Sequence, residues 1–298
     1  MKVPHHPPHD WARFIRSIRH FFESRGFLEV STPLLVPAGA FENAIDPLTV
    51  HSQAESTQLH TSPEMEMKVV LAEVKAPIFQ ICKCFRDDPD TEIHFKEFHM
   101  LEFYRPHCTY ETTQKDVIEL LLTITQAPIS TRRMSIDQLF REKVGIELEK
   151  APTAEQLLKK ALALGLDSLS SNNTWEDLFF RIMLDKIEPS LDPQVPTLVT
   201  DYPASVSTLA KPKDSFWGER FELFWKGMEL CNGATELVSE KLLRSRYEFE
   251  SRERQKVGKA PHPFPERLAA VMHKLPESSG VAVGLDRLFW AVRSQKTS

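Results

Sequence analysis

The chain has 298 residues, of which 27% are charged and 41% hydrophobic, and its formal net charge is −5. These proportions exclude a disordered chain, and the absence of any run of ~20 apolar residues excludes a membrane span and favours a cytoplasmic protein. The acidic charge has the wrong sign for a protein that wraps nucleic acid on a broad basic surface.

The first half of the chain alternates helical and strand patterns. Apolar residues at helical spacing predict a first helix with Asp10 as its N-cap, closed by Gly26. A short strand is expected at 27–30, and Pro63 begins a helix that continues to Val74. Two strands, 78–85 and 98–104, are predicted to pair antiparallel across a polar loop.

The second half contains more helices and then further strands. Residues 110–126 are predicted to be helical, and three shorter helices carry capping signals at Ser135 with Gln138, Thr153 with Gln156, and Thr174 with Asp177. Strands are expected at 197–201, 219–225, 227–231 and 281–283, a helix at 239–257, and a last helix near Asp286. Adjacent antiparallel strands with helices outside predict an α+β fold.

The domain organisation predicted from these elements is simple. We interpret the chain, residues 1–298, as a single catalytic domain in which about 130–190 is a helical insertion.

Histidines and cysteines near possible metal-ligand spacing have ordinary interpretations. His5, His6 and His9 lie in a proline-rich terminus, which is typical of a solvated tail. Cys82 and Cys84 alternate on a predicted strand, and we interpret them as reduced core cysteines, because a zinc site needs about four ligands and no second pair is visible.

The informative residues are carboxylates and arginines on predicted strands. Glu222, Glu229 and Glu236 recur every seven residues. Arg86 ends one strand, and Arg287 follows a glycine turn near the C-terminus. Paired carboxylates suit a hard cation such as Mg²⁺, and the guanidinium fork suits phosphate oxygens. Each charge alone could be a solvated surface group, but the set predicts a site for a phosphate compound and a metal.

These segments resemble the catalytic core of class II aminoacyl-tRNA synthetases of the lysyl type. Residues 26–33 resemble motif 1, residues 85–104 resemble motif 2, and residues 284–288 resemble motif 3. Residues 60–64 and 229–236 are similar to segments that line the lysine pocket in that family. The resemblance covers essentially the whole chain and implies an antiparallel sheet flanked by helices.

Motif 1 begins within the first ~30 residues, so we expect no anticodon-binding domain, which would need more chain. This architecture resembles stand-alone synthetase paralogues that ligate (R)-β-lysine onto a lysine of translation elongation factor P. The resemblance implies that elongation factor P is the acceptor protein and that (R)-β-lysine or lysine is the small-molecule substrate. It also implies a homodimer with Pro33 at the interface, no tRNA partner and no membrane partner.

The resemblance implies a role for each matching residue. Arg86 and Arg287 would be catalytic and would hold phosphates of a bent ATP, while Glu222 and Glu229 would hold Mg²⁺. The ATP-binding residues implied are Arg86, Asp87, Asp88, His94, Phe95, Phe98, Glu229, Leu230, Gly284 and Arg287. The substrate-binding residues implied are Ser62, Pro63, Glu64, Glu102, Tyr104, Asn232 and Glu236.

Three positions depart from the family pattern, namely Asp88, Phe95 and Ala234. They are compatible with a divergent ligase or with a non-catalytic paralogue that binds lysine or an adenylate. A truncated lysyl-tRNA synthetase-like enzyme that activates lysine for another acceptor is a further alternative. The retained Arg86 and Arg287 favour an enzyme, because a non-catalytic protein does not need phosphate-binding groups.

Overall fold

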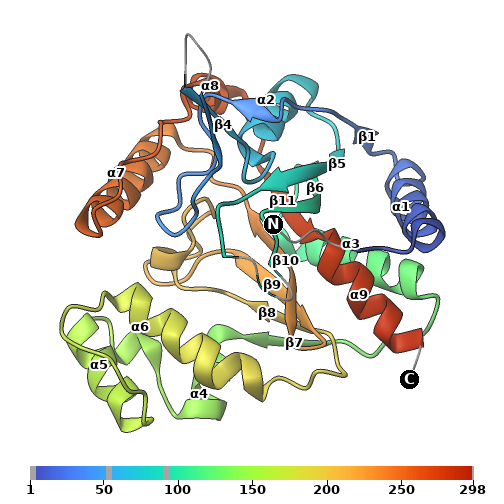
Figure 1. The fold of residues 1–298 in the computed structure, drawn as a ribbon. Helices are drawn as coiled ribbons and strands as arrows, with labels where there is room; N and C mark the ends of the chain where they lie inside the picture. The colour runs from blue at the N-terminus through green and yellow to red at the C-terminus, as the bar shows by residue number, and fades with distance from the viewer. Residues whose placement is uncertain (1–4, 52–55, 90, 92–93, 297–298) are drawn as a thin grey trace. The chain divides into compact units, whose positions relative to one another are not determined.

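The computed structural model describes residues 5–51, 56–89, 91 and 94–296 (Figure 1). The helices are α1 (Pro8–Glu23), α2 (Glu64–Val74), α3 (Tyr110–Thr125), α4 (Ile136–Val144), α5 (Ala154–Ala163), α6 (Trp175–Ile182), α7 (Glu240–Lys256), α8 (Glu266–Val271) and α9 (Leu285–Lys296). The strands are β1 (Leu28–Glu29), β2 (Leu35–Val36), β3 (Thr49–His51), β4 (Ser56–Leu59), β5 (Ile78–Phe85), β6 (Glu97–Pro106), β7 (Arg132–Ser135), β8 (Thr197–Thr200), β9 (Arg220–Trp225), β10 (Met228–Thr235) and β11 (Ser278–Gly284). Within these described ranges, every helix is too short or too polar to cross a lipid bilayer.

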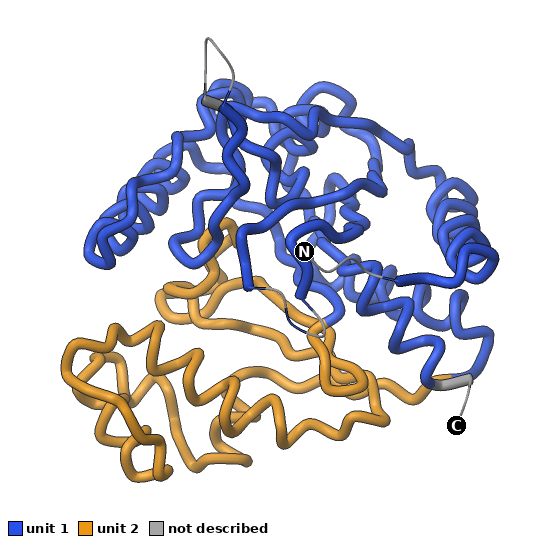
Figure 2. The backbone as a smooth tube through the Cα atoms, viewed as in Figure 1, with its two compact units in different colours: residues 1–128, 230–298 blue, residues 129–229 orange. Residues whose placement is uncertain are grey.

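The chain divides into two compact units, drawn in different colours in Figure 2. Unit 1 comprises residues 1–128 and 230–298, and unit 2 comprises residues 129–229. The helical segment at about 130–190 therefore belongs to unit 2, together with β7, β8 and β9. The expectation of a single domain stays a prediction.

Unit 1 is built on a sheet with the strand order β1-β5-β6-β11-β10. β5, β6, β11 and β10 pair antiparallel, whereas β1 pairs parallel to β5. The predicted pair at 78–85 and 98–104 is confirmed, with Ile78 opposite Tyr104 and Phe85 opposite Glu97. The structure and its antiparallel pairs confirm the predicted α+β class.

The two faces of this sheet have different surroundings. On one face, Phe79 of β5 and Phe103 of β6 lie 5.0 and 4.9 Å from the ring of Phe22, which is buried on α1. Because neighbouring residues of a strand point to opposite faces, Glu102 and Tyr104 point away from α1. The helix-covered face supplies the apolar core and leaves the other face for polar side chains.

Helix α1 begins earlier than predicted. Asp10 is not its N-cap, since the helix starts at Pro8 and Pro7 occupies the cap position. Proline is favoured in the first turn because its fixed φ suits a helix and its missing N–H would have no partner there. Asp10 lies in this turn, where the helix dipole favours an acidic group.

Unit 2 confirms the three capping predictions. Ser135 accepts a hydrogen bond from the Gln138 backbone N–H at the start of α4, and Thr153 and Thr174 form capping boxes on α5 and α6. These helices pack through stacked rings, with Phe140 and Phe179 5.3 Å apart. In the strands of this unit, β9 pairs antiparallel with β8, and β8 pairs parallel with β7.

A tight turn leads from β9 into β10. Lys226 and Gly227 both have positive φ, at 55° and 74°. Two successive positive-φ residues match a type I′ turn, whose twist suits a two-residue β-hairpin. The turn sets the register of Glu222 and Glu229, which lie on either side of it.

The sequence analysis missed the small sheet of order β2-β4-β3. Its strands have two, four and three residues in that order, too few for a side-chain alternation to be recognised.

Candidate active site

The predicted substrate residues converge on the polar face of the unit 1 sheet. Glu102 is 1% exposed, and both of its carboxylate oxygens accept hydrogen bonds, from the Ser62 hydroxyl at 2.6 Å and the Tyr104 hydroxyl at 2.5 Å. Ser62 also accepts a hydrogen bond from the backbone N–H of Glu64. Pro63 occupies the N-cap position of α2 and so joins the Ser62 turn to the helix that carries Glu64. These contacts hold four predicted residues in one network.

Register places Asn232 in the same row as Glu102. Ala282 of β11 pairs with Glu102 on one side and with Asn232 on the other. Directly opposed residues share a face, so Asn232 points to the same side of the sheet as Glu102. By the same argument, Gly280 lies between Tyr104 and Ala234.

A lysine that the sequence analysis did not select lies among these acids. Lys68, on α2 and 1% exposed, donates hydrogen bonds to Glu64 at 2.6 Å and to Glu236 at 2.5 Å. Although burial lowers it, the charges of Glu236 and Glu64 raise the pKa of Lys68 above its ordinary value. Its position four residues after Glu64 was the available signal, since i and i+4 are neighbours on a helix.

The site holds more carboxylates than Lys68 can neutralise. Burial, followed by the charge of Glu64, raises the pKa of Glu102 from 4.5 to about 8. Burial raises the pKa of Glu236 to about 7 even though Lys68 opposes the shift. Burial and the charge of Glu64 also raise the pKa of nearby Glu42 to about 7. Raised pKa values of this kind mean that an added cation would be favourable here.

Gly280 makes room for two of these side chains. A Cβ at this position would lie 2.2 Å from Tyr104 Cε1 and 2.5 Å from a carboxylate oxygen of Glu236. Atoms cannot approach so closely, so any larger residue would displace one of them. Glu236 is also held through its backbone N–H, which donates to the Ser278 carbonyl at 2.8 Å.

A second group of predicted residues lies at the end of β5. The Arg86 guanidinium lies 5.3 Å from the centroid of the Phe98 ring, and its Nε donates to the Thr61 carbonyl at 3.4 Å. An arginine over one face of an aromatic ring can bind a phosphate while the ring's other face stacks on a base. Arg86 and Phe98 lie close together, and their assignment to a nucleotide site stays a prediction.

The loop after Arg86 brings further predicted residues close to it. Burial and the charges of Arg287 and Arg86 lower the pKa of His94, and the charge of Asp88 opposes them. Asp87 instead pairs with Lys96. Arg86, Asp88, His94 and Arg287 are therefore near enough to influence one another electrostatically.

Three more of the predicted nucleotide residues, Phe95, Leu230 and Gly284, belong to unit 1. Phe95 packs edge to face on Trp290 of α9, with ring centroids 5.7 Å apart. Gly284 pairs with Met100 of β6 and precedes the helix that carries Arg287. Leu230 is buried and shares a sheet face with Asn232, two residues along β10.

The start of α9 is fixed by a buried histidine network. The Asp286 carboxylate accepts hydrogen bonds from the His6 ring at 2.5 Å and from the His99 backbone N–H at 2.6 Å. Although burial raises it, these histidines bring the pKa of Asp286 down to about 2. The interpretation of His6 as a solvated residue is wrong, because its ring stacks on Trp11 and its side chain is 6% exposed.

The predicted metal ligands, Glu222 and Glu229, both lie in unit 2. Glu222 is 7% exposed and accepts hydrogen bonds from the Tyr202 hydroxyl at 2.5 Å and from Arg220 at 2.6 Å. Burial and then the charge of Glu229 raise the pKa of Glu222 to about 7. Two mutually repelling carboxylates with oxygen donors fit a hard cation such as Mg²⁺.

Comparisons with known proteins show the family to which the chain belongs. A family model for class II tRNA synthetases (D, K and N) matches residues 11–297. The elongation factor P (R)-β-lysine ligase of Edwardsiella ictaluri is 34% identical over 287 residues, covering 93% of this chain and 88% of the relative. That of Proteus mirabilis is 35% identical over 287 residues, with coverage of 93% and 88%. A ligase homologue from Aquifex aeolicus is 34% identical over 283 residues, with coverage of 94% and 92%.

Proposed function

Because the chain belongs to the class II tRNA synthetases of the D, K and N type, we propose that it uses ATP to activate (R)-β-lysine and transfers the amino acid to a lysine of elongation factor P. The names of the relatives, which are (R)-β-lysine ligases of elongation factor P, support this substrate and acceptor. The observation that carries the proposal is the excess of buried carboxylates around Lys68, which suits a substrate with two ammonium groups.

The substrate residues have distinct tasks in this proposal. Glu64, Glu102 and Glu236 bind the two ammonium groups, and the raised pKa values of Glu102 and Glu236 fall when a cation arrives. Tyr104 and Asn232 orient the substrate on the sheet face. The substrate carboxylate then faces the nucleotide and stays free to react, because the protein does not pair it with a cation.

The first half-reaction needs positioning more than covalent chemistry. Arg86 binds the α-phosphate, Phe98 stacks on adenine, and Arg287 binds the γ-phosphate. The substrate carboxylate attacks the α-phosphorus in line, pyrophosphate leaves, and an acyl-adenylate remains. The arginines stabilise the charge that develops on the phosphoryl oxygens.

Glu222 and Glu229 are the residues that would hold Mg²⁺. The ion, when bound, offsets phosphate charge. In the second half-reaction, a deprotonated lysine amine of the acceptor attacks the acyl carbonyl, and AMP leaves. The product is an amide, so this chain needs no nucleophile of its own.

A homodimer and a cytoplasmic location complete the proposal. Three large apolar side chains around the motif 1 segment are strongly exposed, with Leu28 at 51%, Leu34 at 42% and Leu35 at 49%. They flank Pro33, which the family resemblance assigns to the two-fold interface. Their exposure supports this assignment, because a second copy covering them would remove this apolar surface from water.

The test offers purified protein, ATP and elongation factor P together with (R)-β-lysine, α-lysine or no amino acid. Mass spectrometry should show one added lysyl residue on the factor and AMP formation, with the larger rate for (R)-β-lysine. Lysine tRNA in place of the factor should remain uncharged. Charged tRNA together with an unmodified factor would show that the acceptor is wrong.

A further inference from the structure

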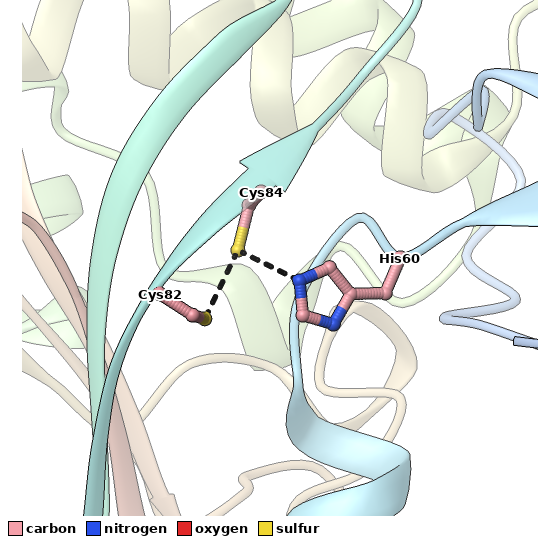
Figure 3. Close-up of side chains that lie close together, drawn as sticks. All are labelled: His60, Cys82 and Cys84. Carbon is pink, nitrogen blue, oxygen red and sulfur yellow. Dashed lines mark hydrogen bonds between the residues drawn. The ribbon is translucent and has the colours of Figure 1, made fainter. Parts of the chain in front are cut away.

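A cluster of soft ligands lies beside the substrate residues and has no part in the chemistry above. His60 precedes α2, and Cys82 and Cys84 lie on β5 (Figure 3). Figure 3 shows both sulfur atoms and the His60 ring converging on one small volume. His60 is 1% exposed, Cys84 is fully buried, and both cysteines are reduced.

The spacing of the donor atoms matches that of a metal centre. The sulfur atoms of Cys82 and Cys84 are 3.9 Å apart, and the Cys84 sulfur lies 3.9 Å from Nε2 of His60. All three ligand atoms lie within 4.8 Å of one another. In a tetrahedral zinc site with bonds of about 2.3 Å to sulfur and 2.0 Å to nitrogen, the ligand atoms are about 3.6 to 3.8 Å apart. Shifts of a few tenths of an ångström to about 1 Å would close the cluster around an ion.

A change of tautomer would let the His60 ring bind an ion through Nε2. Its Nε2 lies 2.7 Å from the Lys83 carbonyl and donates to it, while its buried Nδ1 has no hydrogen-bond partner among the described residues. Moving the ring proton to Nδ1 frees the Nε2 lone pair for an ion. Binding would exchange one hydrogen bond for a metal bond and would release the thiol protons to solvent.

We propose that His60, Cys82 and Cys84 form a binding site for a single thiophilic d¹⁰ cation, either Zn²⁺ or Cu(I). Two thiolates and an imidazole are the donor set that such ions prefer over oxygen ligands. Three protein ligands leave one position of a tetrahedral ion open. From the sequence, the cysteines were interpreted as core residues because no second pair of ligands was visible, and His60, more than twenty residues away, was not considered as a ligand.

The proposed metal site adjoins the substrate residues in the sheet and along the chain. Cys82 pairs with Met100 and Gln80 with Glu102, so the sulfur atoms share a sheet face with Glu102. Two residues after His60, Ser62 donates to Glu102. An ion that draws His60 away from Lys83 therefore also displaces the Ser62 turn. If the proposed function holds, an occupied site lowers the rate of amino-acid activation.

Cobalt(II) titration of the full chain, freed of metal and kept reduced, tests the site without using activity. The expected result is one Co²⁺ per chain, with sulfur-to-cobalt charge-transfer bands and intense tetrahedral bands that one equivalent of Zn²⁺ abolishes. A separate arm measures Cu(I) by competition with a colorimetric chelator. Tighter binding of one ion identifies the occupant.

The variants locate the site. Cys82→Ser and Cys84→Ala should abolish the charge-transfer bands, and His60→Gln should weaken binding at least tenfold. Cys108→Ser is the matched control, because the Cys108 thiol lies elsewhere and donates to the Arg105 carbonyl at 3.2 Å. Cys82 is only partly buried, so Cys82→Ser keeps the test available if Cys84→Ala does not fold.

Three outcomes would overturn the proposal: no charge-transfer band in the wild-type protein, unchanged bands in both cysteine variants, or a two-dalton mass loss showing that the pair forms a disulfide instead. The effect on activity is a separate arm, in which Zn²⁺ should slow ATP–pyrophosphate exchange in the wild type but not in Cys82→Ser. Absent exchange in protein freed of Zn²⁺ and Cu(I) but supplied with Mg²⁺ would count against the proposed function, while the cobalt spectra would still decide the metal site.

Discussion

Lys68 determines how the charges of the candidate site are balanced. Its ammonium group is shared by Glu64 and Glu236, while Glu102 depends on the hydroxyl groups of Ser62 and Tyr104. Glu236 thus has one fixed cationic partner before any substrate binds. Removing a buried charge from such a pair leaves the other charge poorly compensated.

We expect Glu236→Gln to weaken amino-acid binding strongly. The neutral amide cannot compensate a substrate ammonium, and an uncompensated buried charge costs roughly 3 to 5 kcal/mol, or ~10²-fold or more in affinity. ATP affinity should change little. Steady-state kinetics with each substrate varied in turn distinguishes the two effects. Glu155→Gln, at a solvated ion pair on α5, is the control, and equal losses for both substrates would mean that Glu236 is misplaced.

The raised pKa of Glu102 predicts how stability depends on pH. A carboxyl group with a folded-state pKa of about 8 holds its proton more tightly in the folded protein than in the unfolded chain, where the pKa is near 4.5. Its contribution to stability is complete below about pH 4.5 and is lost as the pH rises through 8. Denaturant unfolding of the ligand-free wild type and Glu102→Gln at pH 5, 6.5 and 8 measures this. The variant should gain stability relative to the wild type with rising pH, and parallel curves would contradict the assignment.

Arg86 and Asp88 should differ sharply in importance. Arg86 is placed to meet the phosphate that reacts, so Arg86→Ala should lower the adenylation rate by ~10²-fold or more. Asp88 is half-buried and acts electrostatically on His94, so Asp88→Ala should cost only the ~1 kcal/mol of a modest hydrogen bond. Single-turnover adenylation and ATP affinity should be measured for both variants. A harmless Arg86→Ala would favour the non-catalytic alternative.

At the scale of elements, Gly280 of β11 leaves the space that the side chains of Tyr104 and Glu236 occupy. We expect Gly280→Ala to leave the fold intact but raise the KM for the amino acid at least tenfold, since the new Cβ must displace Tyr104 or Glu236. Gly39→Ala is the control, because its Cβ would meet Gln58 at an ordinary 3.6 Å. Circular dichroism and steady-state kinetics check the two claims, and an unchanged KM would exclude this crowding.

Strand predictions succeeded where alternation and length agreed. β5 has the predicted bounds, 78–85, because eight residues of strand-forming sequence end at a polar loop. β10 and β11 are longer than predicted, since glycine, asparagine and serine within them look like turn residues. In the sheet, Ser279 and Gly280 pair with β10 on one side and with β6 on the other, and Asn232 and Gly233 pair with β11. The residues that the candidate site needs therefore made the full length of these two strands hard to recognise from the sequence.

Over the whole molecule, the family motifs predicted which residues would meet but not what else would join them. Lys68 was not anticipated although it lies four residues after Glu64, because its contact with the distant Glu236 leaves no local pattern. The role of His6 was not anticipated because its partner Asp286 lies 280 residues away. The short strand expected at 27–30 is confirmed by β1, but its parallel pairing with β5 was not predicted, because a strand of two residues carries no signal of its partner.

Assembly can be tested through the exposed leucines. Leu35→Asp should convert a dimer into a monomer, because each two-fold interface would gain two buried charges from one substitution. Sedimentation velocity at micromolar concentration measures the change. Leu162→Asp, at a 50% exposed leucine of unit 2, is the control. A monomeric wild type with full activity would contradict the proposed interface.

The excess of buried carboxylates around Lys68 affects how well the enzyme would distinguish its substrate from other amino acids. If an amino acid of the same length but without the second ammonium group bound here, several acidic groups would lose their partner. The water that otherwise solvates them would also be excluded. Sites built to bind a polar group discriminate against analogues that lack it by roughly 10⁴ to 10⁵. Rejection on this scale happens before adenylation, so an enzyme with this charge arrangement has no need of a second, hydrolytic site to proofread its product.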